Sequence, residues 1–449
     1  MRRICAMNIC LLNDSFPPVI DGVANVVLNY GRALTQNHGA NVIVGTPKYP
    51  NADYTGYPYK VVPYPSIDTT GIIDGYRAGN SLSAREIDEI AEFGPDIIHT
   101  HCPASSTLMA RILQHSTGAP VVFTYHTKFD IDIARAVGDG FRKKEVIKVM
   151  INNISACDEV WTVSQGAGEN LKSLGFEGDY RVMPNGVDFA RGRADGTTVK
   201  AAVKEYDLPP GVPVFLFVGR LVKYKGLPLI LEALKMAREA GLEFRMLMVG
   251  SGPDEEELKK MAEDLRLTDK VFFTGPIRDR EVLRAINTRA DLFLFPSTYD
   301  TNGIVVREAA ACGLASVLIK GSCAAEGIKH GRNGYLIDET PEAMAKLLTD
   351  ICKDMDKVAE VGDHAMKEIY LSWDDAVKMA YERYGEIREL AAAGEYLNRK
   401  REPVDYLIAA AADAAEAFKR IGDVPKHFIT HIHEEIEAAR DRMEGQLWQ

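Results

Sequence analysis

Short apolar runs alternate with longer amphipathic stretches along the first 190 residues of the chain. The apolar runs predict β-strands, and apolar positions at helical spacing predict the α-helices between them. The predicted strands lie at 4–12, 42–46, 96–100, 121–125 and 159–163, and predicted helices lie at 23–36 and 105–115. This order is typical of a parallel sheet covered by helices on both faces.

The same alternation begins again after a stretch at 189–213 that is rich in glycine, proline and arginine. That composition predicts a connection between two domains, with one short helix in it. Further strands are predicted at 214–218, 244–249, 271–274 and 292–295, with helices at 227–240 and 255–265. We therefore predict an α/β protein in which two Rossmann-like domains, 1–190 and 206–372, face each other across a cleft.

The segment 296–317, PSTYDTNGIVVREAAACGLASV, places Asp300 and Glu308 around a turn that leads into a helix. Residues 301–303 suit a turn or cap, and we expect the helix to run over 304–312 before a glycine ends it. The amino end of a helix attracts phosphate, and a glutamate further along can accept hydrogen bonds from hydroxyl groups. An anion and a polyol side by side indicate a nucleotide sugar.

Arg220 and Lys225, in VGRLVKYKG, follow the predicted strand 214–218. Two cations at a strand end suit a diphosphate, since one pair of unit charges ~4 Å apart contributes roughly 4 kcal/mol at an effective dielectric near 20. An isolated RxxxxK motif is more often two solvated side chains. The position at a strand end, with acids downstream, favours phosphate binding here.

Two further strand ends carry polar candidates. Gly22, in DGV, stands where a backbone can approach a phosphate and a helix begins, although a tight turn explains it equally well. His126 follows the strand 121–125 and can hydrogen-bond a sugar or phosphate oxygen. Because Lys128 and Asp130 follow it directly, a cleft position is favoured over a structural one, whereas His101 in DIIHTHCP fits both.

The segment 140–154, GFRKKEVIKVMINNI, is amphipathic. Basic residues near an anionic membrane surface contribute about 1 kcal/mol each, and apolar residues anchor such a helix. A helix that covers a sheet has the same pattern, so both interpretations stay open. The residues expected to face a membrane are Arg142, Lys143, Lys144 and Lys148.

Composition narrows the class of protein. The 449 residues are 46% hydrophobic and 26% charged, which is ordinary for two or three globular domains. A net charge of −11 argues against nucleic acid as a partner.

The seven cysteines include no CxxC pair and fit reduced thiols of the cytoplasm. We predict no metal site, even at His427, His431 and His433. The short, broken apolar run at the amino end predicts a strand rather than a signal peptide.

Several motifs, taken in order, resemble those of the retaining glycosyltransferases of family 4, which have the GT-B architecture. They are FPPVIDGV, DIIHTH, YHT, MPNGVD, VGRLVKYKG, MVGSGPDEEEL, FTGPI and PSTYDTNGIVVREAAACG. The resemblance covers residues 4–390, and FPPVIDGV with YHTKFD is most similar to the diacylglycerol glucosyltransferases. It implies that a last helix, 373–390, crosses back onto the first domain. Residues 391–449 fall outside it, and we expect a helical extension without an assigned role.

The resemblance also implies roles for residues of the donor site. Gly22 is expected to approach the donor diphosphate, and Arg220 and Lys225 to neutralise it as it leaves. Glu308 is expected to hold the ribose hydroxyls. Backbone atoms that contact the uracil are expected from Pro276 and Ile277.

For the transferred sugar, the resemblance implies that Asp300 binds its hydroxyls and that His126 lies near the reacting centre. Asp300 replaces the usual glutamate and Asn302 the usual phenylalanine, so the donor sugar stays open. Further contacts to the sugar and phosphate are expected from the backbones of Asn302, Gly303, Ile304 and Val305. On the acceptor side, the candidates are His101, Lys128 and Asp130.

We therefore predict a metal-independent enzyme without a cofactor that moves a hexose, with retention, onto an acceptor hydroxyl. Glucose from UDP-glucose is the expected donor group, and a membrane lipid such as diacylglycerol is the expected acceptor. We expect a cytoplasmic protein that binds peripherally to the inner face of the membrane. Alternative acceptors are a glycan or a small molecule. Rival classes are a nucleotide-sugar epimerase, a phosphorylase, and a non-catalytic membrane or partner scaffold.

Overall fold

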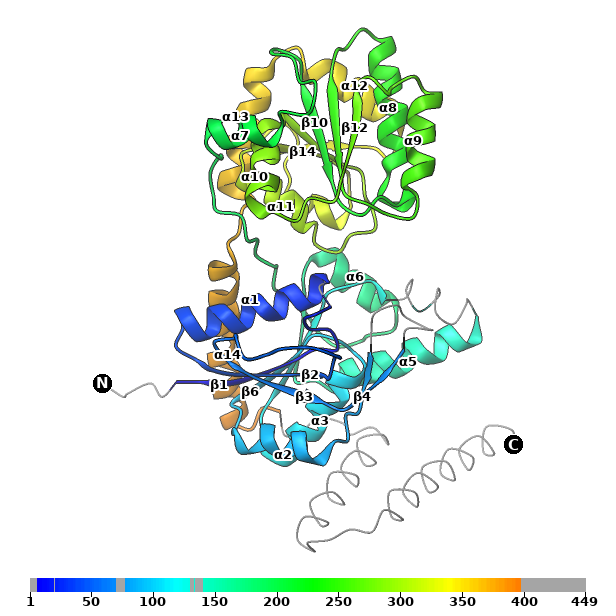
Figure 1. Cartoon of the computed structure of the whole chain (residues 1–449). Helices are drawn as coiled ribbons and strands as arrows, with labels where there is room; N and C mark the ends of the chain where they lie inside the picture. The colour runs from blue at the N-terminus through cyan, green and yellow to red at the C-terminus, as the bar shows by residue number, and fades with distance from the viewer. Residues whose placement is uncertain (1–5, 20, 70–76, 130–132, 134–139, 397–449) are drawn as a thin grey trace, which may run out of the picture.

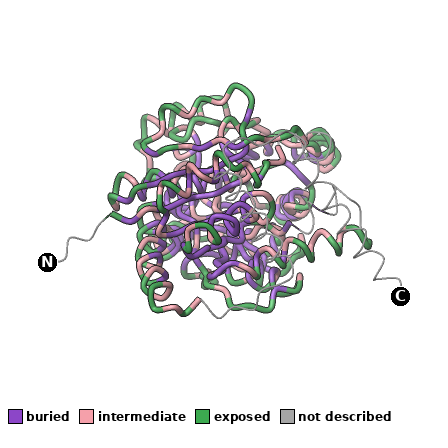
Figure 2. The backbone as a smooth tube through the Cα atoms, turned by 90° about the horizontal axis from the view of Figure 1, so that it is seen from below, coloured by how far each residue is buried: buried purple, intermediate pink, exposed green. Residues whose placement is uncertain are grey.

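The computed structural model describes residues 6–19, 21–69, 77–129, 133 and 140–396. They form two α/β domains, one above the other in Figure 1. Figure 2 shows that buried residues occupy the middle of the molecule and exposed ones the outer helices. Asp130, the tail histidines and the expected extension from residue 397 onward lie outside the described residues.

Seven parallel strands form the sheet of the first domain, in the order β3-β2-β1-β6-β7-β8-β9. A separate antiparallel ribbon is formed by β4 (Ser66–Asp68) and β5 (Arg77–Gly79). The sheet strands are β1 (Asn8–Leu12), β2 (Asn41–Pro47), β3 (Lys60–Tyr64), β6 (Ile97–Thr100), β7 (Val121–Tyr125), β8 (Glu159–Thr162) and β9 (Arg181–Val182). The helices are α1 (Gly22–Asn37), α2 (Ala84–Glu92), α3 (Ser105–Thr117), α5 (Phe141–Ser155) and α6 (Gln165–Ser173).

Six parallel strands form the sheet of the second domain, in the order β12-β11-β10-β13-β14-β15. The strands are β10 (Val214–Val218), β11 (Arg245–Val249), β12 (Val271–Gly275), β13 (Leu292–Phe295), β14 (Ala315–Ile319) and β15 (Tyr335–Ile337). The helices are α7 (Gly196–Ala202), α8 (Leu227–Glu239), α9 (Glu255–Asp264), α10 (Arg280–Arg289), α11 (Ile304–Ala311), α12 (Pro341–Ile351) and α13 (Met355–Glu368), and the 3₁₀ turns are η1 (Lys223–Lys225) and η2 (Cys323–Ala325).

The order of strands reverses at one place in each sheet. In the first domain, β1 and β6 lie side by side, with β2 and β3 added in turn beyond β1 and β7, β8 and β9 beyond β6. In the second domain, β10 and β13 are the neighbouring strands from which the sheet extends in both directions. Ligands of open α/β sheets bind at such a switch point, beyond the carboxyl ends of the strands. The predicted class of two Rossmann-like domains is thus confirmed, and each domain has one expected binding edge.

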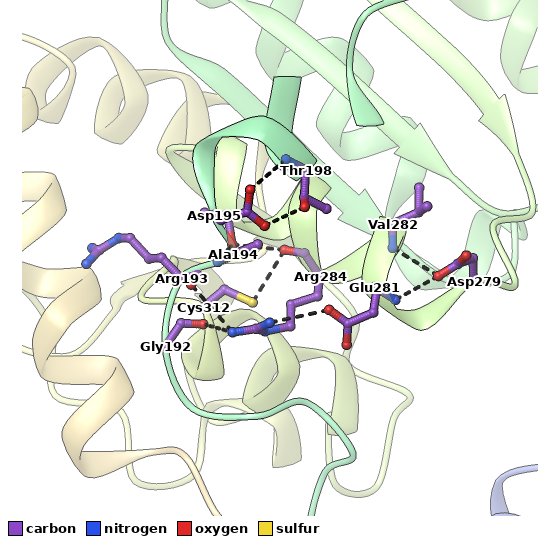
Figure 3. Close-up of polar contacts among 11 residues, drawn as sticks. Gly192, Arg193, Ala194, Asp195, Thr198, Asp279, Glu281, Val282, Arg284 and Cys312 are labelled. Carbon is purple, nitrogen blue, oxygen red and sulfur yellow. Dashed lines mark hydrogen bonds and ion pairs between the residues drawn. The ribbon is translucent and has the colours of Figure 1, made fainter. Parts of the chain in front are cut away.

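The linker after the first domain is bonded to the second domain (Figure 3). The Gly192 amide donates to the carbonyl of Ala311 at 2.8 Å, and Arg284 Nη2 donates to the carbonyl of Gly192 at 2.9 Å. Asp195 then caps α7, because its side chain accepts hydrogen bonds from two backbone N–H groups of that helix. From Gly192 onward the linker is therefore part of the second domain's surface.

The last described helix, α14 (Trp373–Ala392), crosses back onto the first domain, as the resemblance implies. Its apolar face joins the core cluster that includes residues of α1 and β1. Tyr384 is fully buried there and stacks on Trp161, with ring centroids 5.3 Å apart. Both crossings of the chain therefore tie the second domain to the first.

These two crossings lie side by side. The amide of Val187 donates to the carbonyl of Leu371 at 3.0 Å, and Val187 also forms a β-bridge with Ser372. A Cβ atom added to Gly186 would lie 2.5 Å from both N and Cα of Trp373. Glycine is required at this position because the two backbones approach so closely.

Replacing Gly186 with alanine is expected to lower the free energy of unfolding by about 1–3 kcal/mol, the usual cost of overpacking. Urea denaturation followed by far-ultraviolet circular dichroism measures the change. Gly385→Ala, in the middle of α14, is the matched control because an added Cβ there meets nothing within 4 Å. That variant should gain about 0.5–1 kcal/mol from helix propensity. Equal stabilities of the two variants would contradict the close approach.

Candidate active site

The two expected binding edges meet at the loop between β13 and α11. The Thr301 hydroxyl donates to the carbonyl of His126, and Lys128 Nζ donates to the carbonyl of Thr298 at 3.3 Å. The hydroxyl of Ser164 also donates to the carbonyl of Thr301. His126 and Lys128 follow β7 of the first domain, so these bonds join the carboxyl edges of both sheets.

An ion pair between Lys225 and Asp300 lies at the switch point of the second domain. Nζ of Lys225, which ends the turn η1, is 3.1 Å from Oδ1 of Asp300, just beyond β13. The Ser297 hydroxyl donates to Oδ2 of Asp300 at 2.6 Å, and Lys225 Nζ lies 5.6 Å from the ring centroid of Phe295. Both charged side chains are mostly covered, at 17% and 24% exposed. The sequence-predicted cation and acid are therefore brought together.

Arg220 differs from Lys225 in its surroundings. It is exposed and follows β10, the strand that pairs with β13. Its guanidinium has no hydrogen bond or ion pair among the residues that the structure describes. Arg220 therefore offers five N–H donors at the switch point, and this geometry suits a phosphate group.

The helix α11 begins one residue after Gly303, as predicted. Gly303 has a left-handed backbone with φ of +59°, a conformation that favours glycine. In the described structure no side chain caps this helix. The amides of Ile304 and Val305 are therefore available at a helix end that favours negative charge, next to Asn302, which is buried.

Glu308 lies on the covered side of α11, with a side chain that is 9% exposed. Burial raises the pKa of this carboxyl above its usual range, and the ion pair with Arg280 partly opposes the shift. The guanidinium carbon of Arg280 also lies 4.4 Å from the ring centroid of Phe189. The loop from Pro276 to Ile277 follows β12 and leads to this arginine at the start of α10.

Sequence reasoning missed Arg280. A signal exists, because a basic residue in the first turn of a helix opposes the helix dipole and needs another reason to be there. The ion pair with Glu308 gives that reason. Nη2 of Arg280 also lies 3.8 Å from Oδ2 of Asp188. Asp300 and Glu308 are therefore paired with different cations, and no contact joins the two acids in the described structure.

Gly22 is the first residue of α1 and is exposed. The Asp21 side chain caps the helix by accepting from the amide of Ala24 at 2.6 Å. A Cβ atom added to Gly22 would meet nothing within 4 Å. Open space therefore lies in front of this helix end, as the approach of a phosphate requires, but no protein contact forces glycine there.

His101 and His126 are joined by a hydrogen bond, with 3.0 Å between Nδ1 of His101 and Nε2 of His126. The two residues are 2% and 8% exposed. Burial lowers the pKa of His126 to about 3, and it lowers the pKa of His101 well below its usual value. Both rings are therefore neutral near pH 7. His101 is almost fully covered and bonded to His126, and its contact with the acceptor stays a prediction.

The predicted membrane helix α5 provides none of the bonds described above between the first domain and the loop from β13 to α11. Phe141 is 78% exposed and Val149 is 60% exposed, and an apolar groove of about 290 Å³ runs between α5 and the loop before α3. Of the four basic residues, Lys143 is half-buried, while Arg142, Lys144 and Lys148 are exposed. Within the described ranges, no helix is long and apolar enough to span a bilayer.

Comparison with solved structures agrees with the fold of the two domains. The structure of Anabaena HepE in complex with UDP and glucose superimposes with a TM-score of 0.64 at 17% identity, over 85% of this chain and all of that chain. Sucrose-phosphate synthase from Thermosynechococcus elongatus gives a TM-score of 0.66 at 21% identity, over 86% and 100%. Two facing Rossmann-like domains with a returning helix define the GT-B class of glycosyltransferases, to which the fold belongs.

The family follows from two matches that together span both domains. Residues 20–191 match the model described as Glycosyltransferase Family 4, and residues 199–368 match that of glycosyl transferases group 1. The chain belongs to the family 4 glycosyltransferases.

Among its relatives is the sulfoquinovosyl transferase SQD2 of Arabidopsis thaliana, 27% identical over 64% of this chain, an alignment that spans only 56% of that protein. An alpha-monoglucosyldiacylglycerol synthase of Streptococcus pneumoniae is 24% identical over 68% of this chain and 70% of its own length.

The low pKa of His126 makes stability depend on pH. Because the folded value of about 3 lies below the ordinary value of 6.5, the unfolded chain binds more protons as the pH falls from 6.5 toward 3. We expect this residue alone to reduce the free energy of unfolding by roughly 2 kcal/mol between pH 7.5 and pH 5. Urea titrations at both values should show a loss smaller by that amount in His126→Leu. An equal loss in both proteins would contradict the assignment.

Proposed function

We propose that this glycosyltransferase transfers glucose from UDP-glucose, with retention and without a metal ion, to the hydroxyl of a membrane lipid such as diacylglycerol. The observation that carries the proposal is the charge arrangement at the switch point of the second domain. There the exposed Arg220 and Lys225 follow β10, Asp300 pairs with Lys225 just beyond the neighbouring β13, and α11 begins after Gly303 without a side-chain cap. His126 of the first domain is bonded to the same loop.

Each part of the donor has a chemically suited partner in this proposal. The diphosphate binds Arg220, Lys225 and the first amides of α11, and it faces the open space before Gly22. The ribose hydroxyls bind Glu308, and the uracil lies against the backbone at 276–277. Asp300 accepts hydrogen bonds from the hexose. The HepE complex, which contains UDP and glucose, supports this class of donor.

The proposed reaction needs no group beyond these residues. The bond between the anomeric carbon and the UDP oxygen breaks, and the acceptor oxygen bonds to that carbon from the same face. The acceptor proton passes to a phosphate oxygen of the departing UDP. Arg220 and Lys225 stabilise the charge that develops on the diphosphate, which is the interaction that accelerates such a step.

The acceptor is proposed from the surface of the first domain. Exposed Phe141 and Val149 and exposed basic side chains on α5 give an apolar and cationic surface beside an apolar groove. Such a surface suits the interface of an anionic membrane. Relatives that include two alpha-monoglucosyldiacylglycerol synthases and a GDP-mannose-dependent phosphatidylinositol monomannoside mannosyltransferase support a lipid acceptor.

Alanine at Arg220 or Lys225 should lower kcat/KM for UDP-glucose by about 10²–10³-fold, because stabilisation of the leaving diphosphate is lost. UDP release, measured with lipid, glycan and small-molecule acceptors, gives the rate and identifies the acceptor class. Lys223→Ala is the matched control, since Lys223 is in the same turn but pairs with the exposed Glu257. Near-normal turnover in both test variants would remove the assignment. Formation of glucose 1-phosphate from inorganic phosphate and a glucan would favour a phosphorylase, and conversion of UDP-glucose to another UDP-sugar without an acceptor would favour an epimerase.

Sedimentation with vesicles tests the membrane surface. We expect binding to vesicles that contain phosphatidylglycerol and weak binding to phosphatidylcholine alone. Alanine at Arg142, Lys144 and Lys148 together should weaken binding by roughly 100-fold, at about 1 kcal/mol for each charge. A triple variant of exposed lysines on the second domain, Lys260, Lys346 and Lys367, is the control with equal charge change. Equal sedimentation of the two triple variants would leave α5 an ordinary covering helix.

A further inference from the structure

We infer that His101 is a positioning residue, which acts through one hydrogen bond to hold the ring of His126 and present its Nδ1 atom to a hydroxyl of the transferred hexose. The inference rests on the proposed function, because it takes the hexose of UDP-glucose as the ligand. It adds a residue that does not itself touch the sugar. The observations that carry it are the geometry of the two rings and the polar atoms that they leave unused.

The backbone fixes both histidines at adjacent strand ends. His101 follows β6 and His126 follows β7, and these parallel strands are paired. The amide of His101 donates to the carbonyl of Leu12 at 2.9 Å, while the carbonyl of His126 accepts from Thr301 in the loop between β13 and α11. The first histidine is therefore anchored in the sheet of the first domain, and the second is anchored to the second domain.

The ring of His101 is held on several sides. It lies 4.0 Å from the ring of His99 and 5.7 Å from that of Tyr30, measured between centroids. The ring of His126 is nearly parallel to it, at an angle of 24° and with 5.2 Å between the centroids. A ring packed in this way has little freedom to turn, so its hydrogen bond fixes the orientation of the ring of His126.

Proton counting shows what the pair can offer. A neutral imidazole carries one N–H, and one such N–H lies between Nδ1 of His101 and Nε2 of His126. The outer atoms, Nδ1 of His126 and Nε2 of His101, are buried and have no hydrogen-bond partner in the described structure. A buried polar atom without a partner is costly, so a ligand hydroxyl is the natural partner for Nδ1 of His126.

Neither a hydrogen bond from His99 to a ligand nor a metal site formed by the histidines fits the described structure. The ring of His99 is not available, because its nitrogens are bonded to Tyr384 and Thr124. Among the described residues, no group of three or more histidine, cysteine, aspartate or glutamate side chains could hold a metal ion. His101 and His126 therefore act as a separate pair, and His99 supports the fold.

Calorimetric titration of the full chain with UDP and with UDP-glucose tests the inference. UDP lacks the hexose, so its affinity reports the nucleotide site and also confirms that a variant has folded. His101→Leu and His126→Leu should each weaken UDP-glucose by about tenfold, as expected for loss of one hydrogen bond, and leave UDP unchanged. The double variant should be no weaker than His126→Leu, because one residue acts through the other.

Two amide variants refine the test. The amide of His101→Asn can replace Nδ1 and should restore most of the affinity for UDP-glucose, whereas His101→Gln places its amide further out and should resemble His101→Leu. Additive losses in the double variant, or unchanged UDP-glucose affinity in His101→Leu, would overturn the inference alone. If the wild-type protein bound neither nucleotide, the proposed function would fall, and the inference with it.

Discussion

Parallel strands bring all of their carboxyl ends to one edge of a sheet, and in this chain two such edges share one space. The bond from the Thr301 hydroxyl to the carbonyl of His126 joins these edges across the domains. The residues with suitable chemistry follow strands that flank the switch points, so their distance in the sequence does not matter. Lys225 and Asp300, 75 residues apart, form an ion pair for this reason.

The site combines groups that differ in how they tolerate burial. Arg220 is exposed and keeps its donors free, whereas Lys225 and Asp300 neutralise each other in a mostly covered position. The buried Glu308 carboxyl is held at a cost, since its pKa is raised despite the nearby Arg280. A carboxyl pKa that burial shifts in this way is typical of functional sites. Burial lowers the pKa of both His101 and His126, so the first domain's side of these contacts carries no charge from either ring near pH 7.

Much of the fold could be predicted from the sequence, because fully buried parallel strands are nearly continuous apolar runs. The predicted strands at 121–125, 214–218 and 292–295 are β7, β10 and β13, while β1 begins at Asn8 rather than at residue 4. The strand β14 was missed because it follows α11 after a very short turn, and the alanines that end α11 and begin β14 hide the boundary between the two elements. Lys225 and Asp300 were each singled out because they follow strands, but their ion pair and the role of Arg280 were not predicted, since pairing across elements leaves no local pattern. The same holds for the bond between His101 and His126.

The paired crossings at Val187 and Leu371 have a mechanical consequence. Two covalent connections that are bonded to each other at one point act as a pivot, and the linker beyond Gly192 is already fastened to the second domain. Relative movement of the domains is then a swing about that pivot. Such a swing would make or break the polar contacts of the loop between β13 and α11 with the first domain, while the bonds at the pivot stay intact.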